Sequence, residues 1–154
     1  MTDVHDQKTR SRNMAAIKPG NTKPELLVRS HLHSLGFRYR IHDSRLPGKP
    51  DLVFPKYKAV IFVHGCFWHM HCCSLFKIPK TRTEWWIKKL NQNKKRDLLA
   101  QKELEELGWK VLTVWECAIR GRNKVNTSSL ISSIAQWLTL GSSSSSIPSD
   151  ITSH

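Results

Sequence analysis

The sequence predicts an α/β fold, an α/β/α sandwich in which helices cover both faces of a mixed central sheet. Alternating or continuous apolar stretches typical of strands occur at 37–41, 51–54, 59–63 and 109–115. Apolar residues at helical spacing occur at 22–35, 83–107 and 127–138. The order helix, strands, helix, strand, helix favours helices packed on a sheet, because each element must bury its apolar side.

The first helix and the strands after it have clear boundary signals. Thr22 can cap a helix start, Glu25 is placed for a capping box, and Gly36 ends the apolar repeat. The strand at 37–41 follows, and a loop rich in Pro and Gly leads from it to the strand at 51–54. The turn at 55–58 then predicts a hairpin with the next strand.

The second half of the chain contains one long basic helix, one strand and a last helix. The basic helix runs from Thr83 to about Leu107, and Cys117 lies just beyond the strand at 109–115. Asn126 can cap the last helix. We therefore expect a polar, basic arm at 1–20, in which 10–17 could form two helical turns around Met14. One folded domain at 21–140 and a disordered Ser-rich tail at 141–154 complete the chain.

Composition favours a polyanionic partner. The 154 residues have a formal net charge of +13, and Lys and Arg are spread along the whole chain. Such a surface binds nucleic acid by neutralising phosphates and releasing counterions, although a merely soluble basic protein is the simpler alternative. A run of about 20 apolar residues and a signal peptide are both lacking, so we expect a cytoplasmic protein without a membrane partner.

Cysteine and histidine are concentrated in the segment after the third predicted strand. Cys66, His71 and Cys73 provide three ligands within eight residues, and Cys117 could add a fourth from the end of a distant strand. Three thiolates and one imidazole suit tetrahedral Zn²⁺, so we expect a structural zinc site. Cys72 is the alternative to Cys73, and the alternative for Cys117 is a buried thiol.

Hard-cation ligands lie on the neighbouring strands. Asp51, with the backbone carbonyl of Val63, could supply the protein oxygens for Mg²⁺. His64 or His69 could accept a proton from an attacking water, because imidazole titrates near neutrality. Glu25 could hold a metal-bound water. The simpler readings are a solvated turn residue for Asp51, a capping box for Glu25, and zinc ligation or structural hydrogen bonding for the histidines.

These residues resemble those of the bacterial very-short-patch repair (Vsr) DNA mismatch endonucleases over about residues 3–140. The most specific match is residues 60–69, with the sequence VIFVHGCFWH. Further matching segments are 9–14 (TRSRNM), 46–51 (LPGKPD), 81–86 (TRTEWW), 93–97 (NKKRD) and 108–117 (GWKVLTVWEC). The resemblance implies a restriction-endonuclease-like core and Mg²⁺-dependent hydrolysis of one phosphodiester bond, 5′ to the mispaired T of a T:G mismatch.

The resemblance also implies roles for individual residues. Asp51 would be the principal Mg²⁺ ligand and His69 the general base, with His64 near the phosphate and Glu25 behind the ligands. The structural zinc ligands would be Cys66, His71, Cys73 and Cys117.

The DNA-contacting residues implied by the resemblance lie in three segments. Aromatic wedges beside the mismatch would be Phe67, Trp68 and Trp86, with Trp85 an alternative to Trp86 because neighbours on a helix point about 100° apart. The edges of the mispaired bases would be contacted by Lys89 and Asn93. Met14, in the N-terminal arm, would insert from the opposite groove.

Partners follow from the same resemblance. The enzyme would act as a monomer on double-stranded DNA, associate with the nucleoid through DNA, and contact the mismatch-repair protein MutL. Two other functions fit the residues less well. A non-catalytic zinc-dependent DNA-binding module needs no cation-binding carboxylate beside an imidazole, and a double-strand restriction endonuclease would normally need a dimerisation segment.

Overall fold

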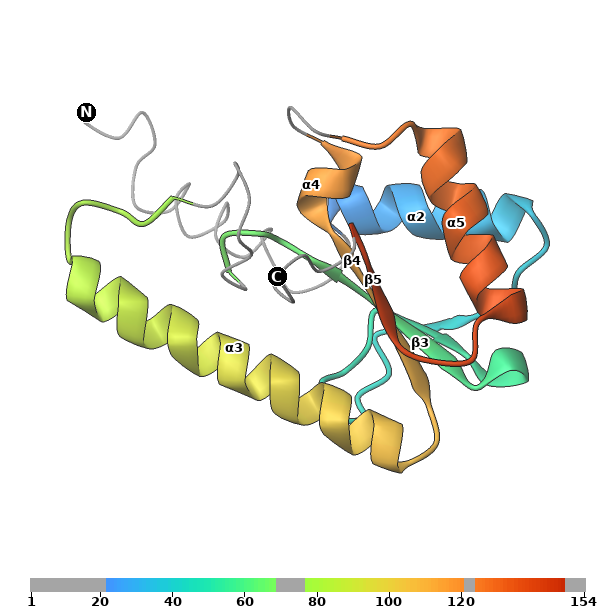
Figure 1. The fold of residues 1–154 in the computed structure, drawn as a ribbon, viewed down its shortest axis with the longest axis horizontal. Helices are drawn as coiled ribbons and strands as arrows, with labels where there is room; N and C mark the ends of the chain where they lie inside the picture. Colours follow the sequence, from blue (N-terminus) through green and yellow to red (C-terminus); the bar gives the residue numbers. More distant parts are fainter. Residues whose placement is uncertain (1–21, 69–76, 121–123, 149–154) are drawn as a thin grey trace, which may run out of the picture.

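The computed structural model describes residues 22–68, 77–120 and 124–148. Within them, five strands form a single mixed sheet in the order β1-β2-β3-β4-β5 (Figure 1). The strands are β1 (Arg40–Ile41), β2 (Leu52–Phe54), β3 (Ala59–His64), β4 (Lys110–Trp115) and β5 (Ser145–Ile147). The mixed sheet predicted from the strand patterns is therefore confirmed.

The pairing of the strands places two chain segments side by side at one end of the sheet. β1, β2 and β3 pair antiparallel, and the turn between β2 and β3 is a 3₁₀ helix, η1 (Pro55–Tyr57). β3 and β4 pair in parallel, with His64 opposite Trp115 at their carboxyl ends. The segment after β3 consequently begins next to α4 (Glu116–Ile119), which follows β4 directly.

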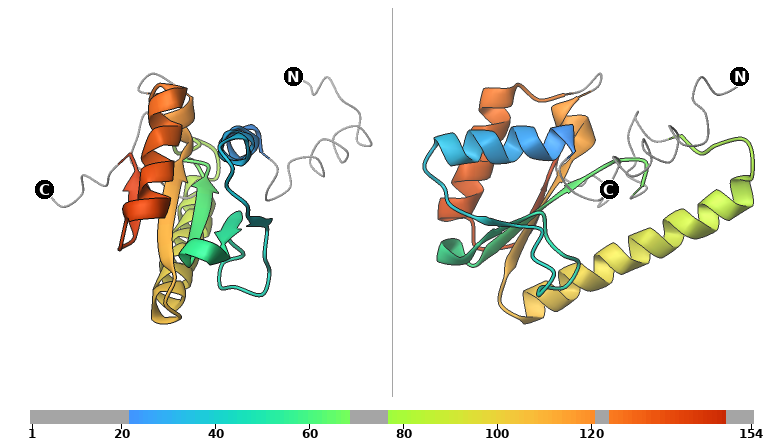
Figure 2. Two further views of the ribbon diagram at one scale, coloured as in Figure 1. Left: turned by 90° about the vertical axis from the view of Figure 1, so that its right-hand side faces the viewer. Right: turned by 180° about the vertical axis from the view of Figure 1, so that it is seen from behind.

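Helices lie on both faces of the sheet. α2 (Lys23–Ser34) and α5 (Thr127–Leu140) bury their apolar sides in one core cluster with β2, β3 and β4. α3 (Thr83–Glu106) covers the opposite face, where Leu104 packs among side chains of the same three strands. The three layers are seen in Figure 1, and Figure 2 gives the edge-on and rear views. The predicted α/β/α layering is confirmed.

Both predicted capping residues have their expected positions. The Thr22 hydroxyl accepts a hydrogen bond from the Glu25 N–H at 3.4 Å, and the Asn126 side chain accepts one from the Ser129 N–H at 3.3 Å. Such caps satisfy N–H groups that the first helical turn leaves without partners. The cap on α2 fixes the turn that carries Glu25.

Gly48 fixes the course of the loop before Asp51. Its φ of +74° lies in the left-handed region that favours glycine, and a Cβ there would lie 2.7 Å from the Cβ of Ala100 on α3. The loop therefore passes close against α3 at a point where no larger residue fits. This contact positions the chain that leads into Asp51 and β2.

Two expectations about the strands need correction. The strand predicted at 37–41 is limited to Arg40–Ile41, because only these residues pair with β2, and the Phe37 N–H instead donates to the Leu32 carbonyl at the end of α2. The disorder expected at 141–154 is wrong for 145–147, which form β5 in parallel with β4.

Polar contacts hold the chain that leads into β5. The Lys110 ammonium donates hydrogen bonds to the carbonyls of Trp137, Leu138 and Gly141 at 2.6–2.9 Å. The Ser144 hydroxyl accepts one from the Val111 N–H at 3.0 Å. Burial among these groups lowers the pKa of Lys110. A Ser-rich composition thus gains order here from a partly buried cation and from side chain to backbone bonds.

Parts of the prediction lie outside the described residues. These are the arm at 1–20 with Met14, the segment 69–76, and the end of the tail at 149–154.

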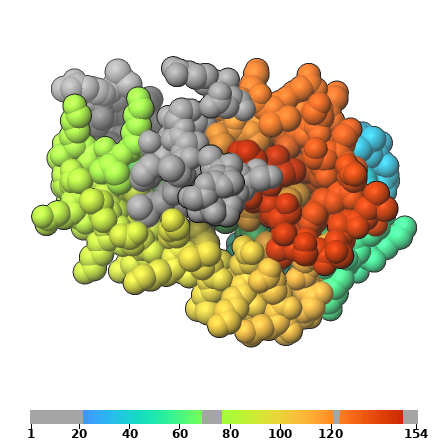
Figure 3. Space-filling view, viewed as in Figure 1, coloured from blue at the N-terminus to red at the C-terminus, as the bar shows by residue number. Residues whose placement is uncertain are grey.

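Across the described part of the chain, none of the helices combines the length and the apolar character needed to cross a membrane. In the space-filling view, α3 forms the left and lower flank of the molecule (Figure 3).

Candidate active site

Two carboxylates and one imidazole come together where α2, β1 and β2 meet. Glu25 lies in the first turn of α2, Asp51 immediately precedes β2, and His42 immediately follows β1. One potential ligand atom from each lies within 4.8 Å of the others. We call these three residues the carboxylate site. Asp51 and Glu25 were predicted site residues, whereas His42 was not.

Hydrogen bonds fix the oxygens of the carboxylate site. Oε2 of Glu25 accepts from Nη1 of Arg29 at 2.9 Å and from Nε2 of His42 at 2.7 Å. Oδ2 of Asp51 accepts from the backbone N–H of Val63 at 2.7 Å. The Glu25 side chain is only 1% exposed. The carboxylates are therefore held in place by three elements, α2, the β1–β2 connection and β3.

The electrostatics of the site favour a bound cation. Burial raises the pKa of Asp51 to about 7, and the nearby Glu25 carboxylate contributes to the rise. The Val63 N–H and, to a smaller extent, Lys49 act in the opposite direction. A second carboxylate at close range raises the cost of charging Asp51 in this poorly solvated position, and a divalent cation would offset that cost. The donor set of this site thus suits a hard divalent metal.

Val63 and His64 lie at the carboxyl end of β3. The Val63 N–H binds Asp51, whereas the proposed contact of its carbonyl with Mg²⁺ stays a prediction. The half-buried His64 ring packs against Phe62 and Trp115, with ring centroids 5.3 Å apart in both pairs. His69, the predicted general base, lies outside the described residues.

Two of the four predicted zinc ligands are described. Cys66 and Cys117 are both buried, and each lies two residues beyond the paired His64 and Trp115 at the ends of β3 and β4. The Cys66 N–H donates to Oε1 of Glu116 at 3.3 Å, which joins the two segments. His71, Cys73 and the alternative Cys72 lie in the undescribed segment 69–76, so the zinc site stays a prediction.

Aromatic rings gather just beyond β3, and we call Phe67, Trp68 and Trp86 the aromatic cluster. Ring centroids are 5.0 Å apart for Phe67 and Trp68, 5.4 Å for Phe67 and Trp86, and 5.9 Å for Trp68 and Trp86. Trp68 is 47% exposed despite these contacts. Residues distant in sequence thus form one partly exposed apolar surface, and their insertion into a base stack stays a prediction.

Trp85 lies beside the aromatic cluster with a different environment. Its ring contacts Trp86 at 4.8 Å and is covered by the Arg82 guanidinium at 4.8 Å, and it is 46% exposed. Trp86 is half-buried between Trp85 and the rings of the loop. Trp86 is therefore the tryptophan of α3 that joins the aromatic cluster.

The exposed side of α3 carries the basic residues next to these rings. The half-buried Asn93 donates from Nδ2 to the Trp68 carbonyl at 3.2 Å. Basic side chains exposed on the same helix are Lys88, Lys89, Lys94, Lys95 and Arg96. This arrangement is typical of a surface that follows a nucleic-acid backbone.

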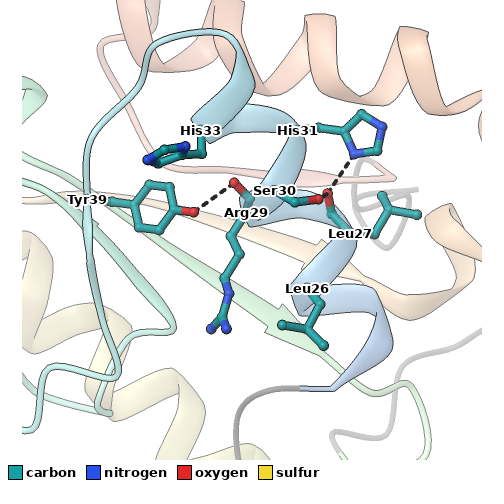
Figure 4. Close-up of a pocket in the computed structure, with 7 residues that line it drawn as sticks. All are labelled: Leu26, Leu27, Arg29, Ser30, His31, His33 and Tyr39. Atoms are coloured by element: carbon teal, nitrogen blue, oxygen red, sulfur yellow. Dashed lines mark hydrogen bonds between the residues drawn. The ribbon is translucent and has the colours of Figure 1, made fainter.

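A shallow groove of about 590 Å³ lies on the outer side of α2 (Figure 4). Tyr39 contributes one wall and donates from its hydroxyl to the Arg29 carbonyl at 2.7 Å. The residues lining the groove do not include Glu25, His42 or Asp51. The groove is consequently separate from the carboxylate site, although Arg29, which lines the groove, donates a hydrogen bond to Glu25.

Comparison with known proteins decides which family this arrangement belongs to. A family model described as DNA mismatch endonuclease Vsr matches residues 2–75. The DNA mismatch endonuclease Vsr of Escherichia coli strain K12 is 49% identical over 90% of this chain and 88% of its own length. The chain belongs to the Vsr DNA mismatch endonuclease family. The resemblance found in the motifs is confirmed.

Other relatives of this Vsr family member are nicking enzymes. The type II nicking enzyme V.NmeAIP of Neisseria meningitidis serogroup A is 48% identical over 79% of this chain and 87% of its own length. The type II nicking enzyme V.XorIIP of Xanthomonas oryzae is 44% identical over 77% of this chain and 88% of its own length. As a Vsr family member, the protein is a DNA endonuclease.

His42 is the residue of the site that sequence reasoning missed. It lies in a turn, where neither helical nor strand periodicity marks it. The signal lies in the pairing, because β1 and β2 are antiparallel and the His42 N–H donates to the Asp51 carbonyl at 3.1 Å. A histidine directly opposite a predicted metal ligand across a hairpin could have been recognised as a candidate.

Proposed function

We propose that the protein nicks one DNA strand 5′ to the mispaired T of a T:G mismatch, by Mg²⁺-dependent phosphodiester hydrolysis. Such mismatches arise when 5-methylcytosine is deaminated, and the nick would start very-short-patch repair. The main support is that β3 and the residues directly after it connect the carboxylate site to the aromatic cluster. Val63, whose N–H binds Asp51, is followed four residues later by Phe67.

The relatives support single-strand cleavage at a mismatch. The Escherichia coli relative is named as a mismatch endonuclease, and the relatives from Neisseria and Xanthomonas are named as nicking enzymes. A mismatch is a chemically reasonable target for inserted rings, because an imperfect pair costs less to unstack than a matched one. Base stacking on an aromatic ring contributes about 1–3 kcal/mol and offsets part of that cost.

In the proposed mechanism Asp51 holds Mg²⁺, together with the Val63 carbonyl, and Glu25 lies behind them. When bound, Mg²⁺ supplies positive charge that stabilises the phosphate as negative charge develops during hydrolysis. His69 would take the proton of the attacking water, since the unperturbed pKa of imidazole lies near neutrality. His64, packed between Phe62 and Trp115, would approach the phosphate.

DNA binding would combine phosphate contacts with the aromatic cluster. The exposed Lys and Arg side chains of α3 would neutralise phosphates beside the mismatch. Phe67, Trp68 and Trp86 would enter the base stack, and Lys89 and Asn93 would approach the mispaired edges. In this proposal Met14 inserts from the opposite groove, the enzyme acts as a monomer in the bacterial cytoplasm, and it contacts MutL.

A structural zinc ion would hold the segment that carries the aromatic cluster. The proposed ligands are Cys66, His71, Cys73 and Cys117, with Cys72 as the alternative to Cys73. Support comes from the burial of Cys66 and Cys117 at the adjoining ends of β3 and β4. Because Cys66 directly precedes Phe67, zinc ligation there would fix the start of the loop.

The proposal is tested by nicking of a labelled duplex library in which one T:G mismatch lies in varied flanking sequence, with Mg²⁺ present. We expect one cut 5′ to the mispaired T in a preferred context and none with Asp51→Ala. Tight mismatch binding without cleavage in every context would instead indicate a non-catalytic binding module. Cleavage of both strands in T:A duplexes would indicate a restriction endonuclease.

A further inference from the structure

His42 connects the two carboxylates of the site through different parts of its structure. Its imidazole Nε2 donates to Oε2 of Glu25 at 2.7 Å, and its backbone N–H donates to the carbonyl of Asp51 at 3.1 Å. Glu25 belongs to α2, whereas Asp51 precedes β2. One residue in the β1–β2 connection thus joins the two elements that supply the carboxylates.

The turn that carries His42 has a left-handed backbone conformation and a side-chain ion pair at the next residue. His42 has a φ of 48°, in the left-handed region that residues other than glycine adopt infrequently. The next residue, Asp43, is buried and accepts hydrogen bonds from the Nε and Nη2 of Arg45 at 2.9 Å each. A turn fixed in this way presents the His42 ring to Glu25 in one orientation.

Side-chain donors from two elements contact the same oxygen of Glu25. Its Oε2 receives hydrogen bonds from both His42 and Arg29, whose side chains are 18% and 20% exposed. The two donors approach from different elements, the β1–β2 connection and α2 itself. With His42 removed, Glu25 would lose its hydrogen bond from the β1–β2 connection, and the bond from Arg29 comes from the same helix one turn further along.

We propose that His42 is a positioning residue, which orients the Glu25 carboxylate toward the cation held by Asp51. The inference rests on the proposed function, since it concerns the proposed metal site. Residues that hydrogen-bond to ligands and their neighbours commonly tune both the orientation of the ligands and the affinity for the metal. The His42 contact requires only an N–H donor, so a side chain with an amide N–H of similar reach should replace it.

The experiment measures Mn²⁺ binding to the DNA-free protein by calorimetry, together with thermal unfolding in the absence of metal. We expect His42→Ala to raise the dissociation constant for Mn²⁺ about tenfold, within the range common for residues that support metal ligands. His42→Gln should restore most of the affinity, because its amide can still donate to Glu25. The matched control is His31→Ala, since His31 is an exposed histidine of α2 whose ring nitrogen contacts the Leu27 carbonyl of its own helix.

A second control separates the inference from the proposed function. Asp51→Asn should abolish the measured Mn²⁺ binding, and unchanged binding in this variant would contradict the metal site itself. If Asp51→Asn abolishes binding but His42→Ala binds Mn²⁺ like the wild type, the positioning function of His42 is wrong. The positioning function would also be wrong if His42→Ala loses Mn²⁺ affinity, His42→Gln does not restore it, and both variants show the same fall in melting temperature.

Discussion

The carboxylate site and the aromatic cluster are held by different kinds of interaction. Glu25 and Asp51 accept hydrogen bonds from side-chain and backbone donors on separate elements. Phe67, Trp68 and Trp86 contact one another ring to ring, and Trp68 remains 47% exposed. The first arrangement suits atoms whose positions must not change, and the second suits rings that exchange neighbours when DNA binds.

This difference implies that catalysis and recognition can be separated by mutation. A substitution in the carboxylate site should affect the chemical step, because its three residues do not form part of the aromatic surface. A substitution in the aromatic cluster should affect mismatch affinity first. The predictions below test this separation in order of decreasing expected effect.

The largest effect is expected from Asp51→Asn. Loss of the charged ligand should lower the nicking rate about 10³-fold or more, because metal stabilisation of phosphate charge contributes several kcal/mol to hydrolysis. Mismatch binding, measured by fluorescence anisotropy without metal, should stay within about threefold of the wild type, since affinity derives mainly from phosphate contacts and stacking. A variant that nicks at a normal rate would show that Asp51 is not the metal ligand.

Removal of the proposed zinc ion should damage the aromatic cluster more than the carboxylate site. Cys117→Ser should lower the melting temperature by about 10 °C or more, since structural zinc contributes strongly to folding free energy. Mn²⁺ binding at the carboxylate site should persist at temperatures where the variant is folded. Zinc content by mass spectrometry is the direct measurement, and a wild-type protein purified without bound zinc would contradict the site.

Truncation of the stacking tryptophan should have an intermediate effect. Trp86→Ala should weaken binding to a T:G duplex by about 1–3 kcal/mol, the usual range for lost base stacking. Trp85→Ala is the matched control, because Trp85 is the neighbouring ring on α3 and lies outside the aromatic cluster. Competition binding measures both variants, and a larger loss for Trp85 would assign the stacking function to that residue.

The smallest expected effect is a pH-dependent change in the stability of the metal-free protein. The pKa of Asp51 is about 7 in the folded protein, against 3.8 for the free side chain, so the folded state binds the proton more tightly. Its contribution to stability is complete below about pH 4 and is lost as pH rises through 7. Between pH 5 and 8, the free energy of unfolding of the wild type should therefore fall relative to that of Asp51→Asn, as measured by chemical denaturation.

Mg²⁺ sharpens the same pH experiment. The cation should stabilise the wild type more at pH 8 than at pH 5, because it binds the ionised carboxylate and competes with the proton. Asp51→Asn should lack this dependence on Mg²⁺. Equal stabilisation of both proteins by Mg²⁺ at every pH would place the cation elsewhere.

Elements with strong local signals could be predicted from the sequence. The caps at Thr22 and Asn126, the long helix from Thr83 and the strand before Cys117 all have the expected places. Their boundaries depend on hydrogen bonds between residues close in sequence, so a local pattern is sufficient. The assignment of Phe67, Trp68 and Trp86 to one set of DNA-contacting residues came from the family resemblance instead.

Features that depend on distant contacts were missed. β5 has a Ser-rich sequence, and its order depends on β4 and on the path of chain held by Lys110 and Ser144. His42 reaches the carboxylate site only through the pairing of β1 with β2 and the placement of α2. Neither relation is encoded in a short stretch of sequence, which is why composition suggested disorder for the first and nothing for the second.

The measurement that tests the proposed activity most directly is single-turnover nicking at saturating protein and Mg²⁺. It compares two labelled duplexes of one sequence, with T:G or T:A at a single position. We predict one cut 5′ to the mispaired T, about 10²-fold faster than any cut in the T:A duplex, because opening a matched pair costs a few kcal/mol more. Equal rates on the two duplexes would contradict mismatch recognition by the aromatic cluster.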